Sequence, residues 1–268
     1  MIEFFLFMAA VALIGSLAAG ISDLKTTEIP DEIPLLMGVI GVFGWLIYAL
    51  TFGDFNPLFS SLLFGTVFLI FGWILYKTGQ WGGGDALLLG AIIYLLPINP
   101  LQIGLFNEFP IAFLVNFMIV GLVYTVIYAV AIGIKNKNTK KLLKKDYKEN
   151  KSIFILDLAF FIIGIISVFY SIQISIMIFM ISFLILFWRY GMIVEKKIFM
   201  RKIKTSDVKV GDVIVDFKKW DGITENQLKE LKKKKKFVTI KEGVRFAPTF
   251  FISLIVTFLL GNVLIIFI

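Results

Sequence analysis

Two aspartates, Asp23 and Asp85, each lie beside a long apolar segment of the chain. Placing a carboxylate within a membrane costs free energy, so acidic groups beside membrane-spanning segments are candidates for function. If the two carboxyl groups share a site, repulsion between their negative charges opposes the ionisation of both, and one of them keeps a proton. The ionised group can take a proton from water that attacks a peptide carbonyl, while the protonated group polarises that carbonyl. The pair therefore has the chemistry of an aspartic endopeptidase.

Composition removes the competing kinds of catalyst. The 268 residues include no cysteine and no histidine, which excludes Cys-His and Ser-His nucleophile pairs and thiolate metal sites. We expect no metal and no cofactor. The chain is 59% hydrophobic and 17% charged, whereas soluble domains are about 45–50% apolar and about 25% charged. This composition predicts a membrane protein.

Three consecutive glycines, Gly82-Gly83-Gly84, stand directly before Asp85. Without side chains, they give an extended substrate room beside the carboxyl group. The alternative is a tight turn before a helix that has Asp85 as its N-cap. Asp23 has a similar alternative, as a loop acid that caps a helix or pairs with Lys25. The residues alone leave these alternatives open.

Apolar runs long enough to cross a bilayer position the two aspartates. About 20 residues are needed at 1.5 Å per residue, and eight candidate spans meet or approach this length: 2–20, 33–51, 57–76, 86–99, 110–134, 153–170, 172–190 and 248–268. The predicted fold is an all-α polytopic membrane protein with about eight transmembrane helices and a small α+β cytoplasmic subdomain.

Basic residues predict the orientation of these helices. With the amino terminus outside, all 27 Lys and Arg fall on the cytoplasmic side: 8 in 135–151, 17 in 189–247, and Lys25 and Lys77. The connections predicted on the other side hold none. This distribution favours two helices rather than one over 153–188. It also places both aspartates at the cytoplasmic boundary, where they can face each other.

The predicted organisation has five parts. The one long polar region, residues 191–247, contains short strand-like segments at 213–217 and 237–240. Within it, Thr224 and Gln227 form a capping box at the start of a basic helix. The predicted parts are catalytic transmembrane helices 1–5 in 1–134, a basic cytoplasmic loop in 135–152, a transmembrane helical hairpin in 153–190, a cytoplasmic subdomain in 191–247 and a C-terminal transmembrane helix in 248–268.

Two short motifs resemble the signatures of the type IV prepilin peptidase family, the membrane aspartyl proteases with a G-x-G-D motif. They are Asp23 followed by Ile29-Pro30-Asp31, and Gly82-Gly83-Gly84-Asp85-Ala86. Within the family, the archaeal preflagellin (archaellin) peptidases are the most similar. The resemblance implies that Asp23 and Asp85 are catalytic. It also implies that the surrounding motif residues contact or accommodate substrate: Gly82, Gly83, Gly84, Ile29, Pro30, Asp31 and Glu32.

The resemblance implies a membrane endopeptidase that removes short basic leader peptides from archaellin or type IV pilin-like precursors, with its active site facing the cytoplasm. Asp31 and Glu32 would then attract a basic leader, the alternative being simple solvation at the interface. Many members have Lys where this chain has Leu87, so local substrate contacts differ. The lack of cysteine argues against the zinc region and the N-methyltransferase activity of bacterial relatives.

Two other functions fit parts of the sequence. An ion- or proton-coupled membrane transporter could use Asp23 and Asp85, but both lie at one membrane boundary and few polar residues lie in the middle of the spans to form a path across the membrane. A non-enzymatic assembly subunit is the third possibility. The net charge of +8 is explained by topology and by contact with membrane lipids, so we expect no nucleic-acid partner.

Overall fold

The computed structural model describes residues 1–98, 109–136, 138–194, 199–208, 213–215, 222–234, 236–241 and 244–263. It divides into two compact units, which are described separately. The first unit comprises Met1–Thr125 and Val244–Ile268, and the second comprises Val126–Gly243. Both ends of the chain therefore contribute to the first unit.

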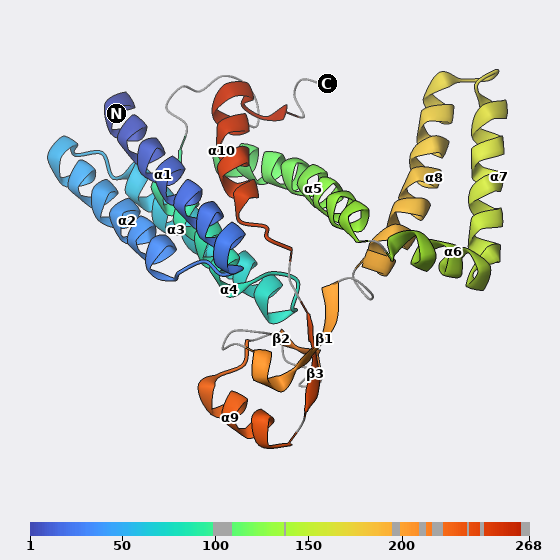
Figure 1. The fold of residues 1–268 in the computed structure, drawn as a ribbon. Helices are drawn as coiled ribbons and strands as arrows, with labels where there is room; N and C mark the ends of the chain where they lie inside the picture. The colour runs from blue at the N-terminus through green and yellow to red at the C-terminus, as the bar shows by residue number, and fades with distance from the viewer. Residues whose placement is uncertain are drawn as a thin grey trace. The chain divides into compact units, whose positions relative to one another are not determined.

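The first unit is a helical bundle that contains both aspartates. Its complete helices are α1 (Ile2–Thr26), α2 (Glu32–Phe52), α3 (Asn56–Lys77), α4 (Gly83–Leu95) and α10 (Pro248–Leu260). The first part of α5 (Phe109–Lys135) also belongs to it. Figure 1 shows α1 to α4 side by side. The last helix, α10, packs against the first.

The short helix α4 forms the centre of this bundle. It packs against α1, α2 and α3, and most of its side chains are buried. Glycines bring the neighbouring helices close: a Cβ built on Gly41 of α2 would lie 2.7 Å from the backbone of Tyr94, and one on Gly72 of α3 would lie 2.9 Å from Ala86 Cα. Trp45 Nε1 donates a hydrogen bond to Leu95 O at 3.1 Å. The bundle therefore fixes α4, and with it Asp85.

The predicted count of about eight membrane-spanning helices is not confirmed. Among the residues that the structure describes, five helices are long and apolar enough to cross a membrane, namely α1, α2, α3, α5 and α8, or six if one bent pair is a single span. Helices α4 and α10 have only 13 residues each. The apolar run of α4 continues beyond its helix, which ends at Leu95 because Leu96 is followed by Pro97, and a residue before proline disfavours the helical conformation. Apolar length therefore overestimated helix length. The chain has the helices of a multi-pass membrane protein.

The second unit contains an antiparallel helical pair, α7 (Lys151–Ser167) and α8 (Ile172–Ile193). Polar side chains meet between the two helices: Ser182 Oγ donates to Asp157 Oδ1 at 2.8 Å, and the hydroxyls of Ser167 and Ser175 lie 3.0 Å apart. The paired polar groups are buried, which avoids leaving unpaired groups in an apolar environment.

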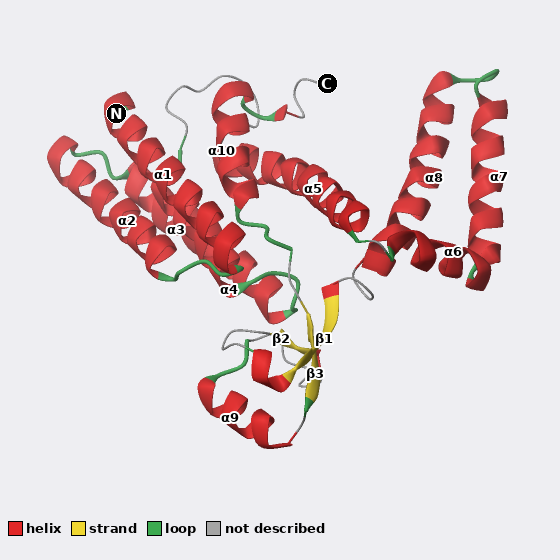
Figure 2. Cartoon of the chain, in the orientation of Figure 1, coloured by secondary structure: helices red, strands yellow, loops and turns green. Residues whose placement is uncertain are grey.

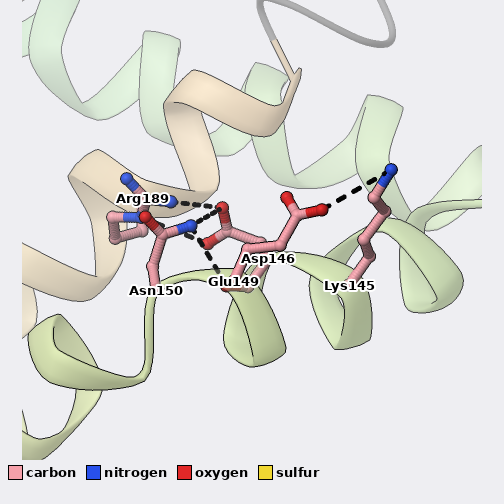
Figure 3. Close-up of polar contacts among 5 residues, drawn as sticks. All are labelled: Lys145, Asp146, Glu149, Asn150 and Arg189. Atoms are coloured by element: carbon pink, nitrogen blue, oxygen red, sulfur yellow. Dashed lines mark hydrogen bonds and ion pairs between the residues drawn. The ribbon is translucent and has the colours of Figure 1, made fainter.

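A basic helix, α6 (Thr139–Glu149), precedes the pair and meets α7 at a bend of 89°. Figure 3 shows the contacts that fix it to α8. Arg189 binds the Asp146 carboxylate with both Nε and Nη2, and Asn150 Nδ2 donates to Asp146 Oδ1 at 3.0 Å. Arg189 and Asp146 are largely enclosed, whereas Lys145 and Glu149 form an exposed pair. The buried contacts hold the angle between α6 and the helical pair.

A small sheet completes the second unit, as Figure 2 shows. Its strand order is β1-β3-β2, with both pairs antiparallel. Strand β1 covers Met200–Lys204, β2 covers Val213–Ile214 and β3 covers Phe237–Lys241. The sheet and α9 (Glu225–Lys234) enclose a separate apolar core. Residues 216–217 of the first predicted strand lie outside the described residues.

The predicted capping box at the start of α9 is confirmed. The Thr224 backbone N–H donates to Gln227 Oε1 at 3.0 Å, and the Gln227 backbone N–H donates to Thr224 Oγ1 at 3.5 Å. Each side chain thus serves a backbone group that has no partner within the helix. By contrast, the basic strand β1 was not predicted, because its charged residues lack the apolar enrichment typical of strands.

Candidate active site

Asp23 lies in the last turn of α1, not in a loop after the helix as the sequence predicted. The helix continues to Thr26 because polar residues extend it beyond its apolar part. The Asp23 side chain is buried, at 6% exposure, and its Oδ2 accepts a hydrogen bond from the Ala247 backbone N–H at 2.9 Å. The alternative in which Asp23 pairs with Lys25 is not seen, since no ion pair joins them within the described residues.

The chain reverses sharply after α1. Thr27 adopts the left-handed conformation, with φ of 65°, and its N–H donates to Asp23 O. This geometry is uncommon for a β-branched residue. The hydroxyls of Ser22 and Thr26 both donate to Glu28 O at 3.1 Å. These bonds hold the segment that carries Ile29 close to the end of α1.

Asp85 lies in the first turn of α4, as its third residue. The alternative that makes Asp85 the N-cap is therefore wrong, because the helix begins at Gly83 and Gly82 is the N-cap. Asp85 Oδ2 accepts a long hydrogen bond of 3.3 Å from the Gly82 backbone N–H. Asp85 Oδ1 is buried without a hydrogen-bond partner, which is unusual for a buried polar atom. The carboxyl group is thus only partly stabilised as an anion.

The two sequence motifs meet at Gly84. A Cβ built on Gly84 would lie 2.7 Å from Ile29 Cβ and 3.3 Å from Ile29 O. A Cβ on Gly83 would make only ordinary contacts, at 3.7 Å or more, with the ring of Tyr76. The bare backbone at Gly84 is therefore what allows the segment with Ile29 to approach Asp85.

Burial raises the pKa of Asp85, which lies outside the five membrane-length helices, to about 7. The second cause is repulsion from the charge of Asp23, while the Gly82 hydrogen bond acts in the opposite direction. The two carboxyl groups are thus close enough to influence each other. A protonated Asp85 beside an ionised Asp23 is the arrangement that one shared proton would produce.

This pKa predicts how hydrolysis would depend on pH. If Asp85 must supply a proton, hydrolysis takes place at pH values below about 7. Activity is lost as the pH rises through that value, because the Asp85 carboxyl group becomes ionised. With a pKa of about 7, kcat at pH 8 should be about tenfold below its plateau. Initial rates at saturating substrate between pH 5 and about 9, with folded protein quantified at each pH, would test this. A flat profile up to pH 9 would contradict it.

The other predicted site residues lie further from the carboxyl pair or face solvent. Asp31, Glu32 and Pro30 are exposed. Asp31 precedes α2 and caps it without a side-chain hydrogen bond, and Glu32 is in the first turn. The sequence interpretation as leader-attracting groups and the interpretation as solvated interface groups both agree with this exposure.

Residues from the other end of the first unit complete the surroundings of Asp23. Besides Ala247, Arg245 contributes a guanidinium group, whose Nη1 donates to Leu24 O at 2.5 Å and whose charge acts on Asp23. The resemblance to the prepilin peptidase family extends to residues 243–250 in the sequence, but no local pattern indicated that Ala247 contacts Asp23, which is 224 residues away. Within the described residues, no three acidic side chains gather closely enough to hold a metal ion.

Comparison with known proteins finds a similarity that covers both aspartates. Residues 10–130 match the family model described as the type IV leader peptidase family. The chain is similar to this family over the matched segment. The matched segment contains both Asp23 and Asp85 but excludes Arg245 and Ala247.

Two proteins to which the chain is similar are preflagellin peptidases. The chain is 31% identical to the preflagellin peptidase of Methanococcus voltae over 145 residues, which are 49% of this chain and 62% of the relative. It is 24% identical to that of Methanococcus maripaludis (strain C6 / ATCC BAA-1332) over 155 residues, 53% of this chain and 67% of the relative. The chain thus spans about three fifths of the length of the Methanococcus voltae protein. No solved structure matches it.

Proposed function

We propose that this protein is a membrane aspartyl endopeptidase that removes short basic leader peptides from archaellin or type IV pilin-like precursors. Asp23 and Asp85 are the catalytic pair, and cleavage takes place at the cytoplasmic side of the membrane. The observation that carries the proposal is the buried Asp85 carboxyl, which has an unpartnered oxygen and a raised pKa and is influenced by the charge of Asp23. The similarity to the type IV leader peptidase family over residues 10–130 and the similarity to preflagellin peptidases support it.

The proposed hydrolysis needs one water molecule and one shared proton. Water attacks the peptide carbonyl carbon, one of its protons passes to the ionised carboxylate, and the protonated carboxyl gives its proton to the carbonyl oxygen. The resulting diol then loses the peptide nitrogen. The first carboxyl protonates that nitrogen, and a hydroxyl proton of the diol returns to the second. The pair thus regains its starting state.

The surroundings of the pair suit a precursor whose basic leader precedes a hydrophobic helix. The exposed Asp31 and Glu32 offer negative charge beside the segment with Ile29. Outward-facing apolar residues on the membrane-length helices offer a surface along which a precursor helix can lie in the bilayer. The leader would then remain in water while the junction reaches the two aspartates.

Co-expression with an epitope-tagged archaellin precursor tests this function. A mobility shift equal to the loss of the leader supports the peptidase, and a tagged pilin-like precursor in parallel measures preference between the two substrates. Uptake of ions into protein-containing vesicles without precursor processing would favour the transporter instead. An unprocessed precursor at normal membrane expression of both proteins would contradict the proposal.

Membrane topology gives a separate prediction. Because basic residues stay on the cytoplasmic side, we expect α6 and α9 to lie inside and the connection before α3 outside. Single cysteines at Lys141, Lys229 and Asn56 report these positions, since the chain has no other cysteine. An impermeant thiol reagent applied outside should label position 56 alone.

Permeabilised cells provide the control, in which all three positions should react. Labelling at 229 but not at 141 in intact cells would mean that α7 and α8 do not cross the membrane as a pair. Such a result would overturn the predicted orientation without affecting the assignment of the catalytic pair.

A further inference from the structure

The segment Val244–Pro248, here called the strap, approaches the candidate site from outside the family-matched residues 10–130. Its Ala247 N–H donates to Asp23 Oδ2 at 2.9 Å, and Arg245 Nη1 donates to Leu24 O at 2.5 Å. Leu24 is in the last turn of α1, where carbonyl groups lack partners within the helix. The strap therefore binds both the carboxylate and the helix end that carries it.

Aromatic packing and one hydrogen bond fix the strap. The ring of Phe246 lies with its centre 6.1 Å from that of Trp81 and 5.5 Å from that of Phe117. Trp81 immediately precedes the glycine motif. Tyr124 OH donates to Arg245 O at 2.7 Å. The strap is thus held against the segment that leads to Asp85 as well as against Asp23.

The two carboxyl groups have unequal surroundings as a result. Burial disfavours a negative charge on either carboxyl group. At Asp23 this is opposed by the backbone hydrogen bond from Ala247 and, to a smaller extent, by the charge of Arg245. Asp85 receives one long hydrogen bond, and its other oxygen is buried without a partner. A negative charge is stabilised by hydrogen-bond donors and by a nearby cation. The anion of the pair therefore belongs on Asp23.

We propose that Arg245 is a positioning residue that, together with the Ala247 N–H, keeps Asp23 ionised, so that Asp23 takes the proton from the attacking water and Asp85 donates to the carbonyl oxygen. This assignment of roles rests on the proposed function. It adds to the catalytic site a part of the chain that the family match does not include. The charged groups that act on Asp23 are Arg245 of the strap and Asp85 of α4.

Two substitutions separate the charge of Arg245 from its hydrogen bond. Arg245→Gln keeps an N–H donor for Leu24 O and loses the charge, whereas Arg245→Lys keeps both. An opposite charge within about 4–6 Å shifts a carboxyl equilibrium by about 1–3 pH units. The Arg245 charge is the smallest of the three influences on Asp23, after burial and the Ala247 hydrogen bond. We therefore expect Arg245→Gln to move the acid limb of the kcat profile to higher pH and to lower kcat at pH values below that limb. KM should change less than about twofold, and Arg245→Lys should keep the wild-type profile.

The assay is cleavage of a tagged archaellin precursor by the full chain in detergent, with rates divided by the amount of folded protein. Lys25→Gln is the matched control, because it removes the same charge from the exposed side of the same helix end, and its profile should equal the wild type. Arg245→Met is a second neutral variant in case Arg245→Gln does not fold.

Each outcome has a distinct meaning. No cleavage by the wild type would contradict the proposed function itself. Wild-type cleavage with an unchanged acid limb in the neutral variants would overturn the role of Arg245. Equal losses in Arg245→Gln and Arg245→Lys at every pH would also overturn it, since that pattern shows a structural contact that does not depend on charge.

Discussion

Asp23→Asn and Asp85→Asn should each lower the rate of precursor cleavage by at least about 1,000-fold, the upper part of the range for loss of general acid–base catalysis. An amide has nearly the shape of a carboxyl group but cannot exchange the proton that hydrolysis requires. In the Asp23→Asn variant, the amide oxygen can still accept the hydrogen bond that the Ala247 N–H donates to the carboxylate. Expression should therefore stay near normal. The measurement is single-turnover cleavage at matched membrane levels of each variant.

Asp31→Asn is the control for this experiment, because it removes one carboxylate from an exposed position. Weaker attraction of a basic leader should raise KM severalfold and leave kcat nearly unchanged. Substantial turnover by either Asp23→Asn or Asp85→Asn would remove that aspartate from the catalytic pair. If only one variant retained activity, hydrolysis by two carboxyl groups would be the wrong mechanism.

Gly84→Ala is expected to have the second largest effect, a loss of roughly 100-fold in cleavage rate. The new methyl group would lie 2.7 Å from Ile29 Cβ. That atom joins directly to the backbone, so it cannot move aside as the end of a flexible side chain could. Either the segment before α2 or Asp85 itself must shift, and a displacement of about 1 Å in a catalytic group is costly.

Gly83→Ala is the matched comparison, one residue away in the same helical turn. Its methyl group would lie 3.7 Å or more from the ring of Tyr76, and alanine favours helix over glycine by up to about 1 kcal/mol. The rate should stay within about threefold of wild type. Equal rates for the two variants, with both proteins folded, would mean that Gly84 serves only the turn. Thermal unfolding in the same detergent separates a catalytic loss from instability.

Much of the helical layout follows from local sequence properties. Apolar runs place the long helices, and the capping box at Thr224 locates the start of α9. The end of α1 was missed because hydropathy marks the apolar part of a helix, whereas Asp23 lies in its polar last turn. The start of α4 was missed for a related reason: its first two residues are glycines, which have low helix propensity.

The composition of the site was only partly predictable. The spacing of Asp23, the segment with Ile29 and the glycine motif indicated which residues belong together, and the contact between Ile29 and Gly84 agrees with that grouping. The resemblance extended to 243–250, but the contacts of Arg245 and Ala247 with the end of α1 could not be predicted in this way. Their contacts with α1 arise from tertiary packing of α10, and neither residue type has a local pattern that indicates proximity to a carboxylate 224 residues away in the chain.

The shortness of α4 also has a consequence for how the protein is made. Its 13 residues rise about 20 Å, well short of the roughly 30 Å hydrocarbon core, so the helix is a poor independent substrate for the membrane-insertion machinery. The backbone groups at its ends must be kept away from lipid, which requires packing against α1, α2 and α3. Asp85 therefore reaches its place at the helix-association stage of biogenesis, after its long neighbours have entered the bilayer. In a nascent chain that has not completed this assembly, the proposed catalytic pair of Asp23 and Asp85 would not yet have formed.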